Sequence, residues 1–509
     1  MDSKTRLATT GVSSELFDLN IPLYPRSLAE QGGTIFFLLS TPAGRRLGLL
    51  AEAGAAALGR FTGESVGRSG KTLLLCPPTH ANAVALRAEF SWLRPAPLGL
   101  ATSAGCGDRL GLATPGHIRA ARTVMARAAD NRSVKMIFCQ QSIREMTRTG
   151  RSPDDVMDDA TWAIFQEGWA EGVGADADHL KTPEDIDRCA AAGYTFFTID
   201  PSAHVDSSAD TAGPAALAAR YEALPWGALE TTPGGMQQAY RGKSFDLGER
   251  AVSIPEETIV RAAVKYGGAV AHVAAMHRYL LETKGRDGWE LEVSVDETDT
   301  PTSQAEHLFI ANELQRLGVR WVSLAPRYVG RFEKGVDYVG DVAAFEEDFR
   351  GHAIIARAMG PYKLSLHTGS DKFSIYAIAS RYTGGLLHLK TAGTSYLEAL
   401  RATASFDPEL FREILSLAIE RYETDRVSYH VSADLAKVPR PEMLSDSELP
   451  DLLEQFDARQ VLHVTFGSVL NSDRGHKSRL MAGLVAHEEI HYGVLERHFI
   501  RHLDPMIQS

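Results

Sequence analysis

The sequence repeats one pattern, in which a short run of β-branched or aromatic residues ends in polar residues and is followed by a helical periodicity. Such alternation is typical of βα units, whose parallel strands are covered by helices. The runs are MIFCQQ from Met136, GVGADADH from Gly172, TFFTIDPS from Thr195, ELEVSVDETD from Glu290, WVSLAPRY from Trp321, KLSLHTGSD from Lys363, LLHLKTAG from Leu386 and VSYHVSAD from Val427. About eight units in roughly 300 residues predict a (β/α)8 barrel of the TIM type.

The 509 residues exceed what one ordinary core holds, so we expect additions to the barrel. The barrel is predicted over residues 131–440, after an N-terminal α/β region at residues 1–130 and before a C-terminal helical segment at residues 441–509. Strands are expected from Thr34 and Thr72, and either of them is also compatible with the barrel.

Two further segments have a predicted structure. Residues 205–285 form a long insertion between two strands, with a helix that starts at Pro255, and we expect the insertion to act as a lid. The stretch from Ser478 to Met506 predicts one long amphipathic helix on the outside of the barrel.

Charge and cysteine usage limit the partners and the compartment. The net charge of −12 and the pI near 5.8 argue against a nucleic-acid or membrane-binding surface, so we expect a small-molecule partner and leave a homo-oligomer open. The four cysteines are widely spaced without a CxxC pair, which predicts reduced thiols in a cytoplasmic protein. Residues 1–20 lack the apolar core of a signal peptide, and no apolar run reaches the roughly 18 residues of a membrane span.

The alternation of strand side chains predicts which residues face the lumen. In KLSLHTG, Leu364 and Leu366 point toward the helices, whereas Lys363, Ser365 and His367 point inward. The same parity selects Gln140, Asp200, Glu292, Asp296, Arg327, His388, Lys390 and His430, with Asp178 and His179 at the end of their strand. Ionisable groups are costly in a packed lumen, so this set predicts an active site at the carboxyl-end rim.

Histidines beside carboxylates predict a divalent metal site, since imidazole nitrogen and carboxylate oxygen bind zinc, manganese, nickel or cobalt. The expected ligands are His179, His367 and His388, with His430 in reserve. The alternative for each is a histidine that only forms hydrogen bonds inside the lumen.

Acid–base and substrate-binding roles follow from the remaining polar residues. Asp178, Glu292 and Asp296 are candidates for acid and base on opposite faces of a substrate, although Glu292 is also compatible with a structural pair to a lumen lysine. Lys390 is a candidate to polarise an oxyanion or to form a Schiff base, or else a plain salt-bridge partner. The predicted substrate-binding residues are Arg327, Asp200 and Asp371. Of these, Arg327 is the candidate to bind a substrate carboxylate through its planar guanidinium.

The stretch from His487 to His491 matches HExxH, the zinc-peptidase motif with two histidines one helical turn apart. It lies in a charge-rich terminal helix among other histidines, a context that gives the match little weight. The sequence has no P-loop and no GxGxxG after a strand, which argues against a bound nucleotide or a tightly held NAD.

Several long segments resemble the tagaturonate/fructuronate epimerase family. They are VSVDETDTPT (293–302), APRYVGRFEKGVDYVGD (325–341), HTGSDKFSIY (367–376), HLKTAGTSYLEALR (388–401) and HFIRHLDPM (498–506). The likeness runs from about Gly172 to the C-terminus and is strongest between Glu290 and Arg401. It implies a metal-dependent epimerase of hexuronate catabolism that interconverts D-tagaturonate and D-fructuronate.

These two keto acids differ at a carbon β to the ketone, whose C–H simple enolisation does not acidify. Retro-aldol cleavage, transient oxidation by NAD and a proton relay between carboxylates are the routes that invert such a centre, and the missing dinucleotide motif disfavours the second. Alternative functions are a metal-dependent aldolase or ketose epimerase for a related sugar, a non-catalytic sugar-acid-binding barrel and a zinc peptidase.

Overall fold

The computed structural model describes residues 21–508 except 42–43, 69, 129–132 and 250. The segment 1–20, for which we expected no signal peptide, lies outside the described residues. Eight parallel strands close a barrel, as predicted, and each strand pairs with the next along the chain. The strands are β6 (Ser103–Cys106), β7 (Lys135–Ser142), β8 (Val173–Leu180), β9 (Phe196–Ile199), β12 (Glu290–Ser294), β13 (Ser323–Ala325), β14 (Lys363–His367) and β15 (Leu387–Thr391).

The strand that closes the barrel is not the one that the sequence predicted. The expected strand from Val427 is wrong: Arg426–Ser428 forms a short 3-10 helix, and Val427 is 85% exposed. The barrel is closed instead by β6, which pairs with β15 through Ser103 and His388. This strand lies inside the segment 1–130 that was assigned to the N-terminal region. Its sequence, SAGC, has neither β-branched nor aromatic residues, so it carries no strand signal.

Helices cover the barrel, and several of them start at a capping side chain. The first ones along the barrel are α3 (Thr114–Met125), α4 (Ile143–Thr149), α5 (Pro153–Glu167) and α6 (Pro183–Ala191). Those that follow the later strands are α10 (Gln304–Arg316), α11 (Val342–Met359), α12 (Phe373–Thr383) and α13 (Thr394–Phe406). Among them, α4, α5, α6, α10 and α11 start at a capping side chain. The side chains of Ser152 and Asp155 form a capping box at the start of α5, and such a box satisfies two backbone N–H groups that the helix leaves unpaired.

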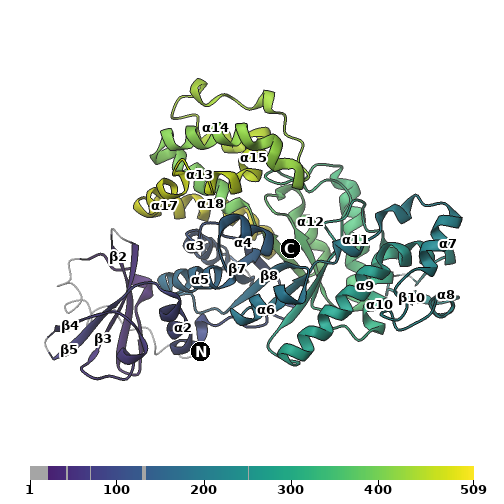
Figure 1. Ribbon diagram of the computed structural model, residues 1–509, viewed down its shortest axis with the longest axis horizontal. Coiled ribbons are helices and arrows are strands. Elements are labelled where there is room, and N and C mark those ends of the chain that lie inside the picture. Colours follow the sequence, from purple (N-terminus) through teal and green to yellow (C-terminus); the bar gives the residue numbers. More distant parts are fainter. Residues whose placement is uncertain (1–20, 42–43, 69, 129–132, 250, 509) are drawn as a thin grey trace.

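The N-terminal part is an antiparallel sheet beside the barrel (Figure 1). Its strands, in spatial order, are β1 (Ala29–Gln31), β2 (Thr34–Thr41), β3 (Gly44–Glu52), β5 (Lys71–Cys76) and β4 (Glu64–Arg68), and α2 (His80–Glu89) follows. The strands predicted from Thr34 and Thr72 therefore belong to this sheet. Phe36 packs edge-on against Phe90, which in turn contacts Phe165 of α5, so the sheet and the barrel share one apolar core.

The insertion between β9 and β12 contains α7 (Pro214–Glu222), α8 (Pro233–Tyr240), a hairpin of β10 (Ser244–Asp246) with β11 (Ala251–Ser253), and α9 (Glu256–Lys284). The long helix α9 begins directly after Pro255, as predicted. No helix in the described part of the chain joins the length and the apolar composition needed to cross a bilayer.

The C-terminal helices are α14 (Pro408–Asp425), α15 (Phe456–Val464), α16 (Phe466–Leu470), α17 (His476–Ala486) and α18 (Glu488–Ile507). The single helix predicted from Ser478 to Met506 is wrong, because the chain breaks at His487 into α17 and α18. The two helices serve different cores: Leu480 of α17 packs with the C-terminal helices, whereas Leu503 of α18 packs with the barrel. The expected position of α18 outside the barrel is confirmed, since it contacts α3, α12 and α13.

Candidate active site

A buried lysine stands at the centre of the barrel mouth. Lys390 on β15 places its Nζ 2.8 Å from carboxylate oxygens of three acidic residues, namely Asp176, Asp178 and Glu292. Burial by itself would lower the pKa of Lys390, but these carboxylates raise it well above its usual range. Lys390 is therefore an ammonium ion that neutralises the acidic groups. A charged amine is no nucleophile, so this geometry does not favour the Schiff-base alternative.

Two histidines lie beside this cluster. His367 at the end of β14 places Nε2 2.7 Å from Glu292 Oε1 and Nδ1 3.2 Å from Asp296 Oδ1. Burial would lower the pKa of His367, and the carboxylates of Asp296 and Glu292 raise it to about 9. His179 places Nδ1 3.3 Å from Asp200 Oδ2 and packs edge-on against His367, with 5.2 Å between ring centroids.

The backbone of β8 explains how Asp178 and His179 face the same site although they are neighbours. Strict alternation would send them to opposite sides of the strand. The pairing of β8 with β9 shifts register between Ala177 and Leu180, and His179 has φ +52°, a left-handed conformation that is uncommon outside glycine. A bulge of this kind re-aims a side chain and occurs often beside active sites.

These side chains fit a divalent cation. One donor atom each from Asp178, His179 and His367 lies within 4.8 Å of the other two, and a second such set joins His179 to Asp200 and Glu297. Imidazole nitrogen and carboxylate oxygen are ligands for zinc, manganese, nickel and cobalt.

Two adjoining cavities lie over the cluster. An inner chamber of about 30 Å³ is lined by residues that include Asp178, His179 and Lys390. An outer cavity of about 380 Å³ shares Asp296 and His367 with the chamber. Its walls come from residues 327–334 and 428–432, and none of the described residues of the insertion 205–285 lines either cavity. The expected lid is therefore not placed over the site in this structure.

Comparisons with known proteins show which family the chain belongs to. The model of the tagaturonate epimerase family (UxaE) matches residues 24–506. The chain belongs to this family. A tagaturonate/fructuronate epimerase from Thermotoga maritima is 42% identical over 493 residues, which cover 97% of this chain and 98% of that protein. This chain is thus an isomerase of the epimerase type.

Solved structures of a tagaturonate epimerase family member show the same fold. The native structure of the fructuronate-tagaturonate epimerase UxaE from Cohnella laeviribosi has a TM-score of 0.87 and 36% identity, and the match covers 97% of this chain and 98% of that one. A glycerol complex of the same enzyme has a TM-score of 0.88 with equal identity and coverage. The barrel and its additions are therefore common to both proteins.

Two residues predicted at the site of this epimerase lie elsewhere. His388 faces the lumen but sits two residues before Lys390 and so one layer deeper, where Nδ1 lies 2.8 Å from Ser103 Oγ. It belongs to none of the three candidate metal sets among the described residues, the third of which joins Asp371 to His498 and His502. Asp371, predicted to bind substrate, is buried outside both cavities and accepts hydrogen bonds from His498 and His502. Asp371 lies beyond the end of β14, where strand parity no longer applies.

The remaining predicted residues have clear positions. Asp200 is buried behind His179, Glu292 lies under Lys390 without lining either cavity, and Arg327 and His430 line the outer cavity. The sequence analysis missed Asp176, although it shares the parity of Asp178. Other residues of the cavity walls were also missed because they lie outside the strands and carry no local signal; they include Arg144 of α4, Lys334 and Tyr429.

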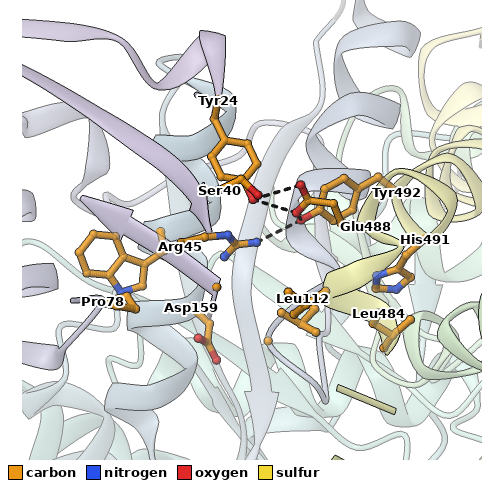
Figure 2. Close-up of a pocket in the computed structure, with 14 residues that line it drawn as sticks. Tyr24, Ser40, Arg45, Pro78, Leu112, Asp159, Leu484, Glu488, His491 and Tyr492 are labelled. Carbon is orange, nitrogen blue, oxygen red and sulfur yellow. Dashed lines mark hydrogen bonds between the residues drawn. The ribbon is translucent and has the colours of Figure 1, made fainter. Parts of the chain in front are cut away.

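The HExxH match of this epimerase does not form a metal site in the described chain. His487 lies outside the helix and stacks on Phe406, with 4.5 Å between ring centroids. Glu488 accepts hydrogen bonds from the hydroxyls of Tyr24 and Tyr492 beside a cavity of about 190 Å³ (Figure 2). Glu488 therefore helps to join the N-terminal segment to α18.

Glu488→Gln is expected to leave epimerase activity within about twofold and to lower the melting temperature slightly, because tyrosine hydroxyls lose a charged acceptor worth about 1–3 kcal/mol. Steady-state kinetics and thermal unfolding measure the two effects. Complete loss of activity with an unchanged melting temperature would indicate that the HExxH motif takes part in catalysis.

Proposed function

We propose that this epimerase interconverts D-tagaturonate and D-fructuronate as a step of hexuronate catabolism. The observation that carries the proposal is the 42% identity to a relative of that name over 97% of the chain. The acidic barrel mouth with two histidines supports it, since a polarised ketone and a mobile hydroxyl proton need such groups. The four cysteines are buried and unpaired, which supports a cytoplasmic setting.

We further propose that His179 and His367 bind a divalent cation together with one carboxylate from Asp178, Asp200 or Glu297. The support is the convergence of donors from Asp178, His179 and His367 within 4.8 Å, and a second set of the same spacing joins His179, without His367, to Asp200 and Glu297. A bound cation would polarise the substrate ketone and stabilise the negative charge that develops on its oxygen. Asp296, which lies 3.2 Å from His367 Nδ1, orients that imidazole.

Retro-aldol cleavage is the route that the site supports best. A base takes the proton of the hydroxyl on the inverting carbon, the bond to the neighbouring carbon breaks, and its electron pair moves onto the ketone group. The aldehyde fragment rotates and is attacked on its other face, and the proton then returns to the new alkoxide. The steps balance without an added oxidant or reductant.

We assign Asp178 as the base that takes this hydroxyl proton. It lines the inner chamber, and its pKa lies below its usual range because His179 and Lys390 outweigh the effect of burial. It is thus an ionised acceptor held in place by Lys390, at 2.8 Å. A relay between Asp178 and Asp296, which lines the same chamber, is the alternative route.

Proton NMR of the metal-loaded enzyme with D-fructuronate in deuterated water tests the proposal. We expect tagaturonate signals that disappear after chelation and return with added cation. Retention of hydrogen at the inverted carbon would support retro-aldol cleavage, whereas deuterium there would support the relay. Absence of tagaturonate from every metal-loaded sample would overturn the proposed function, and accumulation of a free aldehyde instead would identify an aldolase.

A further inference from the structure

Lys334 lies in the wall of both cavities and forms no salt bridge among the described residues, although its charge helps to lower the pKa of Glu297. The arginines and lysines that line the cavities are Arg109, Arg144, Arg327, Arg331, Lys334 and Lys390. Four of them are neutralised: Arg109 by Glu145, Arg144 by Glu297, Arg331 by Glu333, and Lys390 by Asp176, Asp178 and Glu292. Among the described residues, the ammonium of Lys334 forms neither an ion pair nor a hydrogen bond.

We infer that Lys334 binds the carboxylate of the substrate and thereby selects sugar acids over neutral ketoses; this inference rests on the proposed function. Arg327, which the sequence suggested for this task, also lacks an acidic partner among the described residues. It lines only the outer cavity, however, and its guanidinium donates to the Tyr328 carbonyl at 3.4 Å. Lys334 lines the outer cavity and also the chamber that holds Asp178 and His179.

The position of the ammonium is fixed by glycine in the loop after β14. Gly369 lies two residues beyond His367 and has φ +58°. A Cβ added to Gly369 would lie 2.8 Å from Lys334 Nζ, so the absence of a side chain there gives the lysine its place. The ammonium therefore lies against the loop that carries a proposed metal ligand.

The backbone around Lys334 is held on both sides. The carboxylate of Glu333 accepts hydrogen bonds from Ser432 at 2.6 Å and Gln460 at 2.7 Å. Gly335 donates to Ser370 at 2.9 Å, and its carbonyl accepts from Arg459 at 2.6 Å. A backbone fixed in this way presents the ammonium at small further entropic cost, which is the benefit of a pre-organised binding group.

The pairing of charges in the cavity walls explains why an unpaired cation is needed. The acidic residues in the cavity walls are Glu145, Asp178, Asp296, Glu297 and Glu333. Four of them already hold Arg109, Lys390, Arg144 and Arg331 in ion pairs, so those cations are not free to bind an anionic substrate, whereas the ammonium of Lys334 is. A neutral ketose, in which a hydroxymethyl group replaces the carboxylate, gains nothing from that group.

Lys334→Met is expected to raise KM for D-fructuronate about 10- to 150-fold, the range for loss of a hydrogen bond between charged groups. The change in kcat should stay within about threefold, because the carboxylate takes no part in bond cleavage. The inhibition constant of D-fructose or D-tagatose against fructuronate turnover should be unchanged. Lys334→Arg, which keeps the charge, should restore most of the affinity.

Lys437→Met is the matched control, since this exposed lysine lies 3.9 Å from Asp434 and the substitution removes the same charge. Metal content is measured in every variant to verify that the site is intact. A KM for Lys334→Met within threefold of the original would overturn the inference, as would a loss confined to kcat. An increased KM in Arg327→Met alone would indicate that Arg327, and not Lys334, binds the substrate carboxylate. Lack of turnover by the original enzyme would instead contradict the proposed function.

Discussion

Lys390→Met is expected to reduce epimerase activity by more than about 1,000-fold and to destabilise the fold by about 3–5 kcal/mol, the usual cost of removing one partner from a buried ion pair. The substitution keeps the length of the side chain but removes the one ammonium that contacts all of Asp176, Asp178 and Glu292. All three are buried, and Asp176 already has a raised pKa from burial and from its acidic neighbours. Thermal unfolding and kcat measure the two losses.

The dependence of this loss on pH identifies its cause. Lys390 helps to keep the pKa of Asp178 and Glu292 low, and without the ammonium these values should rise while the already raised pKa of Asp176 rises further. A carboxyl group whose pKa is raised by folding stabilises the fold at low pH. This contribution is lost as pH rises through the pKa of the group in the folded state. The variant should therefore unfold at a higher temperature at pH 5 than at pH 8.

Lys363→Met provides the matched control for Lys390→Met. Lys363 is equally buried in the lumen, where it donates to Ser103 Oγ at 3.0 Å, and burial lowers its pKa to about 8. Because it forms no close ion pair among the described residues, its removal should cost less stability and show a weaker dependence on pH. Equal losses in both variants would contradict the assigned role of Lys390.

His179→Ala and His367→Ala are each expected to lower metal affinity by about 10-fold to 100-fold or more and kcat by more than about 1,000-fold. Both residues belong to the converging donor set of this site. Other ligands cannot replace a missing nitrogen without moving the backbone. Metal content after dialysis and turnover at saturating cation separate lost binding from lost catalysis.

His388→Gln tests whether depth in the barrel decides metal binding. This histidine contacts Ser103 in the layer below Lys390, so the variant should keep its metal. Loss of metal from His388→Gln with retention in the other two variants would place the cation one layer deeper than we propose.

Strand parity predicted which side chains meet inside the barrel, because lumen-facing residues at strand ends lie at one rim. Glu292, His367 and Lys390 each came from that argument, and the structure brings them within direct contact. Parity predicts which face of a strand a side chain occupies but not how deep in the barrel it lies. It therefore could not show that His388 lies one layer below Lys390. Nor does it extend past the strand ends, where Asp371 turns away toward α18.

The parts that sequence reasoning missed depend on partners far along the chain. The strand β6 is recognisable only through its pairing with β15, since its small residues have little intrinsic β preference. The segment from Val427 alternates like a strand but pairs with no strand in the described part of the chain, and its Tyr429 lines the cavities at the barrel mouth. Lys334 lies on an irregular loop, whose path nothing in the local sequence specifies.

The closure of the barrel by β15 on β6 has a consequence for how the protein folds. The paired residues Ser103 and His388 lie 285 positions apart, so most of the chain must be present before the sheet becomes continuous. The same strand delivers Lys390, so an intermediate in which β15 is not yet paired would hold Asp178 and Glu292 without this counter-charge. We expect the pairing of these distant strands to be a slow step in refolding, and mild acidity should make an open-barrel intermediate live longer.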